Sequence, residues 1–207
     1  KFLKEELGWS WDEQNITIPV YNPDGKLLFC RYRHLEGTAK FTSDPGVHLT
    51  LYAIHKAKKF DQVILAEGEP DVARLWQEGI PAVTGTSGVK TFSAKLAAPL
   101  KGKRIIITLD TDERGFSSTE KYYDILTEAG ADPYIKELPQ ELKDICEYFK
   151  AGFTKKDYLA LPELTLEDWQ NKHEPKTFGW ESADDIRAKK LPEEKSSWCQ
   201  HRLDAIG

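Results

Sequence analysis

The chain has 207 residues, of which 40% are hydrophobic and 30% are charged. This composition is typical of a globular protein that is large enough for one substantial core or two small ones. The net charge of -5 argues against indiscriminate binding to nucleic acid, although residues 26–60 contain seven Lys or Arg residues against two acidic ones.

The first 60 residues predict a small, β-rich and basic subdomain. Residues 16–21 alternate between apolar and polar side chains, residues 22–25 (Asn-Pro-Asp-Gly) are typical of a tight turn, and residues 26–34 predict a second strand. Because side chains alternate along a strand, Arg31 and Arg33 are expected on one face of it.

From residue 61 to residue 150, predicted strands alternate with predicted helices. The strands are expected at 62–66, 80–84, 104–109 and 134–138, and the helices at 70–77, 93–100, 117–129 and 142–149. This alternation predicts an α/β fold with right-handed crossovers and a parallel sheet flanked by helices. Residues 151–207 are polar and irregular, which predicts short helices followed by a linker.

Acidic side chains come directly after two of the apolar strands. Glu67 and Asp71 follow the strand 62–66, and Asp110 and Asp112 follow the strand 104–109. Either pair alone is weak evidence for a functional site, because acidic residues are common near helix N-termini. Together they are expected to meet Asp144 at the edge formed by the carboxyl ends of the strands, where open parallel sheets bind ligands. Crowded carboxylates favour a divalent metal such as Mg²⁺.

Three successive motifs resemble those of a TOPRIM domain. They are Glu67-Gly68-Glu69-Pro70-Asp71, Gly85-Thr86-Ser87-Gly88 and Asp110-Thr111-Asp112. TOPRIM domains occur in DnaG-type primases, type IA and II topoisomerases, certain nucleases and RecR-type recombination proteins. The basic segment before the motifs and Lys143-Asp144-x-x-Glu147-Tyr148 after them are similar to the flanks in DnaG-type and phage or plasmid primases. The resemblance covers residues 14–150 and implies a Rossmann-like TOPRIM domain over 61–150.

The resemblance also implies a role for each matched residue. Glu67 would act as a metal ligand or proton acceptor, Asp110 and Asp112 would hold one or two Mg²⁺ or Mn²⁺ ions, and Asp71 and Asp144 would complete the acidic ring, Asp144 as a further metal ligand. The basic residues expected to contact template or nucleotide are Arg31, Arg33, Lys40, Lys90 and Lys143.

The implied activity is that of a DNA primase core, which joins nucleoside triphosphates into short primers on single-stranded DNA. The implied partner is a replicative helicase, on the same chain or a separate one, because residues 178–198 resemble the segment that enters the ATPase domain of primase–helicase fusions. A TOPRIM nuclease would need only the metal site, and a RecR-like module would bind DNA without catalysis, so both remain alternatives. A topoisomerase would need a nucleophilic tyrosine on a further domain.

The sequence also predicts the cellular location of the protein and whether the chain is part of a longer one. The three cysteines, Cys30, Cys146 and Cys199, are scattered, which favours a reducing compartment and gives no zinc site. No segment is apolar enough for a membrane span or signal peptide, so we expect a cytoplasmic protein. The chain begins at Lys1 and contains no Met, so we expect it to be a fragment of a longer protein.

Overall fold

The computed structural model describes residues 1–37, 40–86 and 92–173. Residues 1–172 form one unit, and a second unit begins at His173. Within the described residues no helix is both long and apolar enough to cross a membrane.

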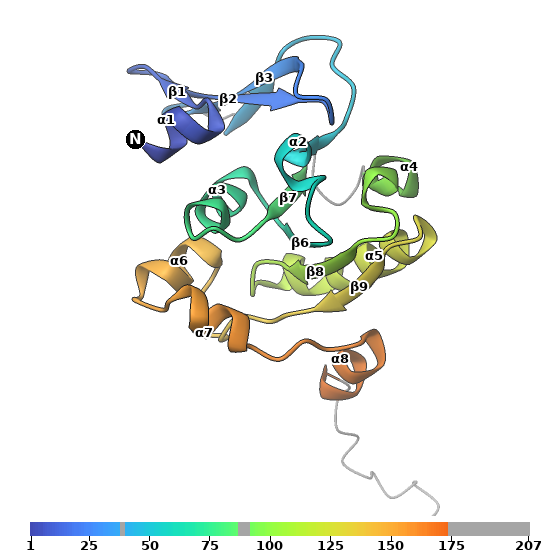
Figure 1. The fold of residues 1–207 in the computed structure, drawn as a ribbon. Coiled ribbons are helices and arrows are strands. Elements are labelled where there is room, and N and C mark those ends of the chain that lie inside the picture. The colour runs from blue at the N-terminus through green and yellow to red at the C-terminus, as the bar shows by residue number, and fades with distance from the viewer. Residues whose placement is uncertain (38–39, 87–91, 174–207) are drawn as a thin grey trace, which may run out of the picture. The chain divides into compact units, whose positions relative to one another are not determined.

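A four-stranded antiparallel sheet forms the N-terminal part of the structure, in the order β1-β2-β3-β4 (Figure 1). It comprises β1 (Ser10–Trp11), β2 (Asn15–Tyr21), β3 (Leu27–His34) and β4 (Phe41–Ser43), and the helix α1 (Phe2–Leu7) precedes it. The predicted hairpin is confirmed: β2 pairs with β3, and Gly25 takes a φ of 82° in the turn between them. The helix α1 was not expected.

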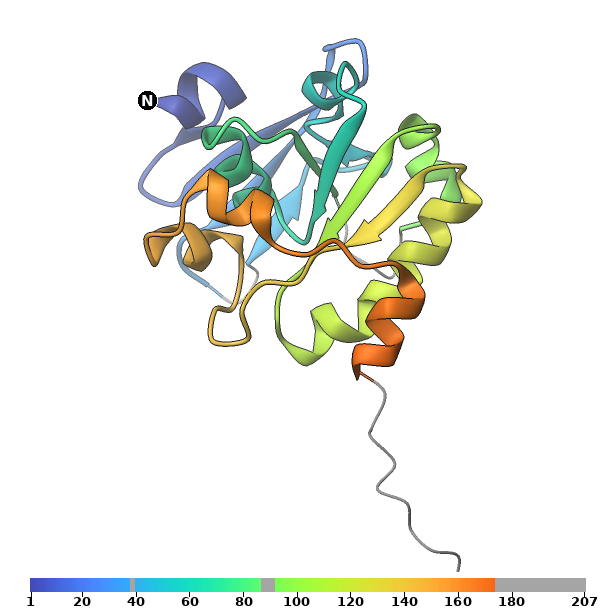
Figure 2. The ribbon, with the colours of Figure 1, turned by 60° about the horizontal axis from the view of Figure 1, so that its bottom comes forward.

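A five-stranded sheet with the order β5-β7-β6-β8-β9 forms the centre of the protein (Figures 1 and 2). Its strands are β5 (Leu51–Tyr52), β6 (Gln62–Ala66), β7 (Ala82–Gly85), β8 (Arg104–Thr108) and β9 (Asp132–Ile135). The last four run parallel, as predicted, and β5 adds an antiparallel edge beside β7. The fold is therefore α/β with a parallel sheet flanked by helices.

The edge strand β5 was not expected in this sheet. Ala53 has a φ of 63° and turns the chain from β5 directly into α2 (Ile54–Ala57). Leu51 and Ile54 are buried in the same apolar cluster as the central strands. Residues 51–57 therefore pack with the parallel sheet, although sequence placed them in the N-terminal subdomain.

The remaining helices lie on the two faces of the central sheet. They are α3 (Glu69–Gln77), α4 (Ala94–Ala97), the 3-10 turn η2 (Ala98–Leu100), α5 (Glu113–Glu128), α6 (Ile145–Lys150), α7 (Lys155–Ala160) and α8 (Leu166–His173). The helix α5 begins four residues before its expected start, because Asp112 caps it by accepting a hydrogen bond from the Gly115 N–H. The last strand, β9, lies at 132–135 instead of 134–138.

The central strands are buried on both faces. Ile64 and Ile106 pack in one cluster with α3, α6 and α7, while Val63 and Ile105 pack in the other with α4 and α5. Each fully buried side chain of this kind contributes roughly 1.5–3 kcal/mol through burial. A parallel sheet covered by helices on both sides requires such continuous apolar runs, which is why these strands were evident in the sequence.

A buried polar network attaches the segment after α6 to the central sheet. The Tyr158 hydroxyl and the Thr108 hydroxyl, both fully buried, share a hydrogen bond of 2.9 Å. Lys136, only 2% exposed, donates to the Tyr158 carbonyl over 3.2 Å and forms a 3.3 Å ion pair with Glu163. Backbone hydrogen bonds also join Ile135 to Leu164 in both directions. Residues 155–164 are therefore part of the folded core.

This network predicts a specific loss of stability in Tyr158→Phe. The substitution leaves the buried Thr108 hydroxyl without its partner, so the free energy of unfolding should fall by about 1–3 kcal/mol. Urea unfolding followed by circular dichroism measures the change. The control is Tyr134→Phe, because the Tyr134 hydroxyl has no hydrogen bond among the described residues and its ring still stacks under Arg104. An equal loss in both variants would contradict the prediction.

Candidate metal centre

The five predicted acidic residues all follow strands of the central sheet or begin the helices beside it. Glu67 follows β6, and Asp71 lies in the first turn of α3. Asp110 follows β8, whereas Asp112 and Asp144 are the N-cap residues of α5 and α6. The parallel topology therefore carries all five to the carboxyl edge of the sheet, as predicted.

Hydrogen bonds to backbone N–H groups orient three of these carboxylates. Glu67 Oε2 accepts from the Asp110 N–H at 3.3 Å, which joins the loops after β6 and β8. Asp112 Oδ1 accepts from the Gly115 N–H at 2.9 Å, and Asp144 Oδ1 accepts from the Glu147 N–H at 2.8 Å. Each of the two N-cap aspartates is thus held by the helix that it begins.

Burial and neighbouring charges raise the pKa values of three of these acids. Partial burial raises the pKa of Asp110 to about 7, and the charges of Glu67, Asp71, Asp144 and Asp112 add to the rise. Burial, with the charges of Asp144 and Glu67, raises the pKa of Asp71 to about 6. Burial also raises the pKa of Glu67. The structure therefore brings all five acids within electrostatic reach, an arrangement that a divalent cation would stabilise.

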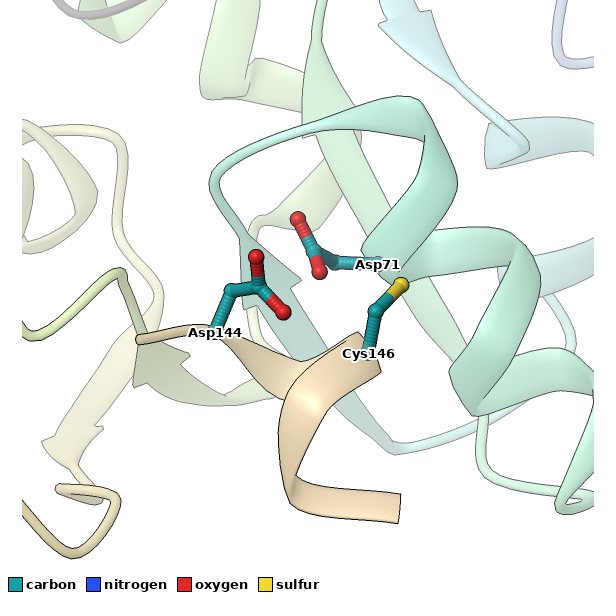
Figure 3. Close-up of side chains that lie close together, drawn as sticks. All are labelled: Asp71, Asp144 and Cys146. Atoms are coloured by element: carbon teal, nitrogen blue, oxygen red, sulfur yellow. The ribbon is translucent and has the colours of Figure 1, made fainter. Parts of the chain in front are cut away.

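Asp71, Asp144 and Cys146 form the tightest part of this cluster. One possible ligand atom of each lies within 4.8 Å of the other two. Figure 3 shows Asp71 on α3 facing Asp144 and Cys146 at the start of α6. Asp71 accepts hydrogen bonds from the side chain and backbone of Cys146, and burial raises the pKa of the thiol to about 12, so the thiol is the donor at neutral pH. The sequence had given Cys146 no place near a metal site.

A glycine fixes how closely α5 approaches the Asp110 loop. A Cβ atom added at Gly115 would lie 2.0 Å from the Asp110 carbonyl oxygen, a distance that real atoms do not occupy. Only glycine therefore allows the helix to begin where Asp112 caps it and Asp110 stays at the edge. The glycine was visible in the sequence three residues after Asp112, but its role follows only from the backbone geometry.

Two cations lie near Glu67. The charges of Arg114 and Lys143 both lower the pKa of its carboxyl against the larger effect of burial. Both side chains are exposed, so they are accessible to a ligand at this edge. Lys143 was predicted to contact template or nucleotide; Arg114 was not, although it lies in the segment after Asp112.

The other predicted basic residues differ in their surroundings. Arg31 forms a 2.8 Å ion pair with Glu69, and the two side chains are 13% and 6% exposed. Arg33 is exposed, and both guanidinium groups lie over the ring of Phe41, at 5.3 and 5.9 Å from its centre. The predicted common face of Arg31 and Arg33 is therefore confirmed, but the charge of Arg31 is already paired.

Lys40 is exposed just before β4, and its backbone carbonyl accepts a hydrogen bond from His34. Lys90, the glycine loop at 87–88 and the segment 178–198 lie outside the described residues. Their predicted contacts with nucleotide, template or helicase stay predictions.

Known proteins resemble this chain in sequence and in fold. Residues 64–149 match the family model described as Toprim-like. The DNA primase of Clostridium acetobutylicum is 30% identical over 159 residues, which cover 72% of this chain and 26% of that protein. The DNA primase of Halalkalibacterium halodurans is 25% identical over 190 residues, which cover 82% of this chain and 31% of that protein. The chain therefore spans less than a third of these two relatives.

Solved structures agree with the fold. The zinc-binding and RNA polymerase domains of the Aquifex aeolicus primase match with a TM-score of 0.65 at 22% identity, over 73% of this chain and 41% of that one. The RNA polymerase domain of Mycobacterium tuberculosis primase DnaG matches with a TM-score of 0.64 at 17% identity, over 99% of this chain and 78% of that one. Residues 64–149 therefore form a TOPRIM domain. The domain in this chain is a TOPRIM domain of the DnaG primase type.

The raised pKa of Asp110 predicts a pH-dependent effect of Asp110→Asn in metal-free protein. As pH rises, the unfolded chain releases this proton near the ordinary value of 3.8, whereas the folded protein keeps it until about pH 7. Between these values the folded protein binds more protons, so its stability falls as pH rises. Asp110→Asn removes this loss, and its stability relative to wild type should therefore increase from pH 4.5 to pH 7.5.

Urea unfolding in EDTA at about pH 4.5 and about pH 7.5 measures this difference. Asp124→Asn, on the exposed side of α5, is the matched control. If Asp110→Asn and Asp124→Asn show the same pH dependence, the crowding of carboxylates at the sheet edge is contradicted.

Proposed function

We propose that this chain is the catalytic core of a DNA primase. It joins nucleoside triphosphates into short primers by metal-dependent nucleotidyl transfer on single-stranded DNA. The single observation that carries the proposal is the gathering of five acidic side chains at the carboxyl edge of a TOPRIM sheet, where burial and neighbouring charges raise the pKa values of Asp110 and Asp71. The DNA primases among its relatives support the choice of reaction.

The acidic edge is proposed to bind one or two divalent cations. Carboxylate oxygens are hard ligands that Mg²⁺ and Mn²⁺ accept, and the proposed ligands are Glu67, Asp110, Asp112 and Asp144. Bound metal would lower the pKa of the attacking 3′-hydroxyl and neutralise charge on the phosphate oxygens. Asp71 completes the acidic ring next to Asp144. Glu67 is also the residue proposed to accept the proton of the hydroxyl, since burial already raises its pKa.

The cations around this edge are proposed to bind phosphate. Arg114 and Lys143 would contact the triphosphate, because their charges already act on Glu67. Arg33 and Lys40 are exposed on the N-terminal sheet and would follow the template backbone. Arg31 is a weaker candidate than the sequence indicated, because a phosphate must compete with Glu69 for its charge.

The proposed partners are single-stranded DNA and a replicative helicase. A DnaG primase catalytic domain bound to single-stranded DNA matches this chain with a TM-score of 0.63 at 16% identity. The primase fragment of the bacteriophage T7 primase–helicase protein matches with a TM-score of 0.59 at 18% identity. At these identities the two structures support a common fold, and the partners are inferred for this chain by analogy.

Primer synthesis tests the proposal directly. The full chain, incubated with single-stranded DNA, labelled nucleoside triphosphates and Mg²⁺ or Mn²⁺, should produce short labelled oligonucleotides. EDTA and Asp110→Asn should each reduce the yield at least about a hundredfold, because the reaction loses its charge stabilisation. Asp124→Asn should retain full yield.

Two other outcomes of this assay decide between the alternatives. A template that becomes shorter in the presence of metal, with no new oligonucleotide, would assign the chain to the TOPRIM nucleases. Metal-independent DNA binding with neither product would favour a RecR-like binding module. Either result would overturn the proposed primase activity.

The salt dependence of DNA binding tests the basic sheet. Arg33→Ala should weaken binding to all single-stranded sequences alike and reduce the slope of log affinity against log salt by about 0.7, the value for one lost contact to single-stranded phosphate. Lys121→Ala, which removes the same charge from the exposed side of α5, is the control and should leave the slope unchanged. Fluorescence anisotropy over a range of salt concentrations gives both slopes. Equal slopes for Arg33→Ala and wild type would remove Arg33 from the DNA path.

A further inference from the structure

Thr111 stands between the two aspartates of the Asp110-Thr111-Asp112 segment and contacts a different part of the chain. Its backbone N–H donates to the Lys143 carbonyl over 2.9 Å. Its hydroxyl donates to the Leu142 carbonyl over 2.8 Å and lies 3.3 Å from the Lys143 carbonyl. One residue therefore joins the loop after β8 to the loop that leads into α6.

The second loop is itself rigidly connected to Asp144. The Lys143 N–H donates to the Glu147 carboxylate over 2.9 Å, and Asp144 accepts from the Glu147 N–H over 2.8 Å. An unbroken series of hydrogen bonds thus runs from Thr111 to the N-cap of α6. Within the described residues, every hydrogen bond between residues 110–112 and residues 142–144 is made by Thr111.

The two loops carry acids that repel each other. Asp110 and Asp112 lie on one loop, Asp144 lies on the other, and Asp71 lies beside Asp144. Without a cation, electrostatic repulsion favours separation of the loops. A metal ion that must first draw the two loops together binds less tightly, because part of its binding free energy is spent on ordering them.

We propose that Thr111 is a positioning residue that holds the two acid-bearing loops at the spacing a divalent cation requires. The Thr111 hydroxyl is not one of the metal ligands; it acts through its hydrogen bonds to the second loop, so Thr111 touches neither metal nor substrate. The inference rests on the proposed function only in taking these carboxylates as the metal site; it holds whichever reaction the metal serves. It also gives the residue between the two aspartates a role that the sequence had left open.

The test is direct binding of Mn²⁺ to the full chain, without DNA or nucleotide, by titration calorimetry. Thr111→Val removes the hydroxyl and keeps the branched shape and the backbone hydrogen bond. Its dissociation constant for Mn²⁺ should rise about three- to tenfold, the range expected for one hydrogen bond. Thr111→Ser keeps the hydroxyl and should stay within about twofold of wild type.

A second threonine supplies the matched control. Thr127 in α5 donates its hydroxyl to the Tyr123 carbonyl over 2.9 Å, away from the acidic edge. Thr127→Val should therefore leave Mn²⁺ binding unchanged. Thr111→Ala, which also lacks the hydroxyl, should weaken Mn²⁺ binding at least as much as Thr111→Val. If the valine variant does not fold, the alanine variant is used in its place.

The outcomes separate this inference from the proposed function. If Thr111→Val or Thr111→Ala binds Mn²⁺ as tightly as wild type, or if Thr127→Val weakens binding equally, the positioning role is overturned even when the wild type makes primers. If the wild type binds Mn²⁺ and Thr111→Val weakens this binding, the positioning role of Thr111 stands even when no primers form. Wild-type protein that binds no Mn²⁺ would overturn both.

Discussion

Repulsion among the carboxylates at one edge of the central sheet is the constraint on which the rest of this structure depends. Asp110 illustrates it, since partial burial, together with the charges of four other acids, raises its pKa to about 7. Such an edge is unfavourable in the absence of a cation, and the free energy that maintains it must come from elsewhere. The buried faces of β6 and β8 are the main source, because their apolar side chains pack on both sides of the sheet.

The backbone around the edge also stabilises the acids directly. Asp112 and Asp144 begin helices, and Asp71 lies in the first turn of another, so the partial positive charge of three helix N-termini faces the acids. The N-cap hydrogen bonds also fix the direction of two carboxylates before any ligand binds. The same geometry therefore both stabilises the acids and prepares them for a metal.

Sequence predicted the central strands and the acidic edge because both depend on local or general rules. Apolar runs such as Ile105-Ile106-Ile107 identify strands buried on both faces, and parallel topology then dictates where the following residues lie. Sequence failed where the structure depends on pairing over long distances. The short strand β5 joins the sheet only through β7, and Tyr158 is buried through contacts with Thr108 and Lys136. No local pattern distinguishes such residues from those of an exposed segment.

The long-range pairing of Glu69, within the motif Glu67-Gly68-Glu69-Pro70-Asp71, was likewise not evident from the sequence. Glu69 lies two residues from both Glu67 and Asp71, and from sequence it counts as one more acid of the cluster. The structure directs it instead to Arg31, in a pair that is almost fully buried. Removing one partner of such a pair leaves a buried charge uncompensated, at a cost of about 3–5 kcal/mol. The N-terminal sheet is thus joined to the start of α3 by charge as well as by packing, and its exposed Arg33 extends from the same strand face as this anchor. The proposed metal site at the acidic edge and the proposed nucleic-acid contacts of the N-terminal sheet can act on one substrate only if their separation is fixed, and the Arg31–Glu69 pair provides that fixed point.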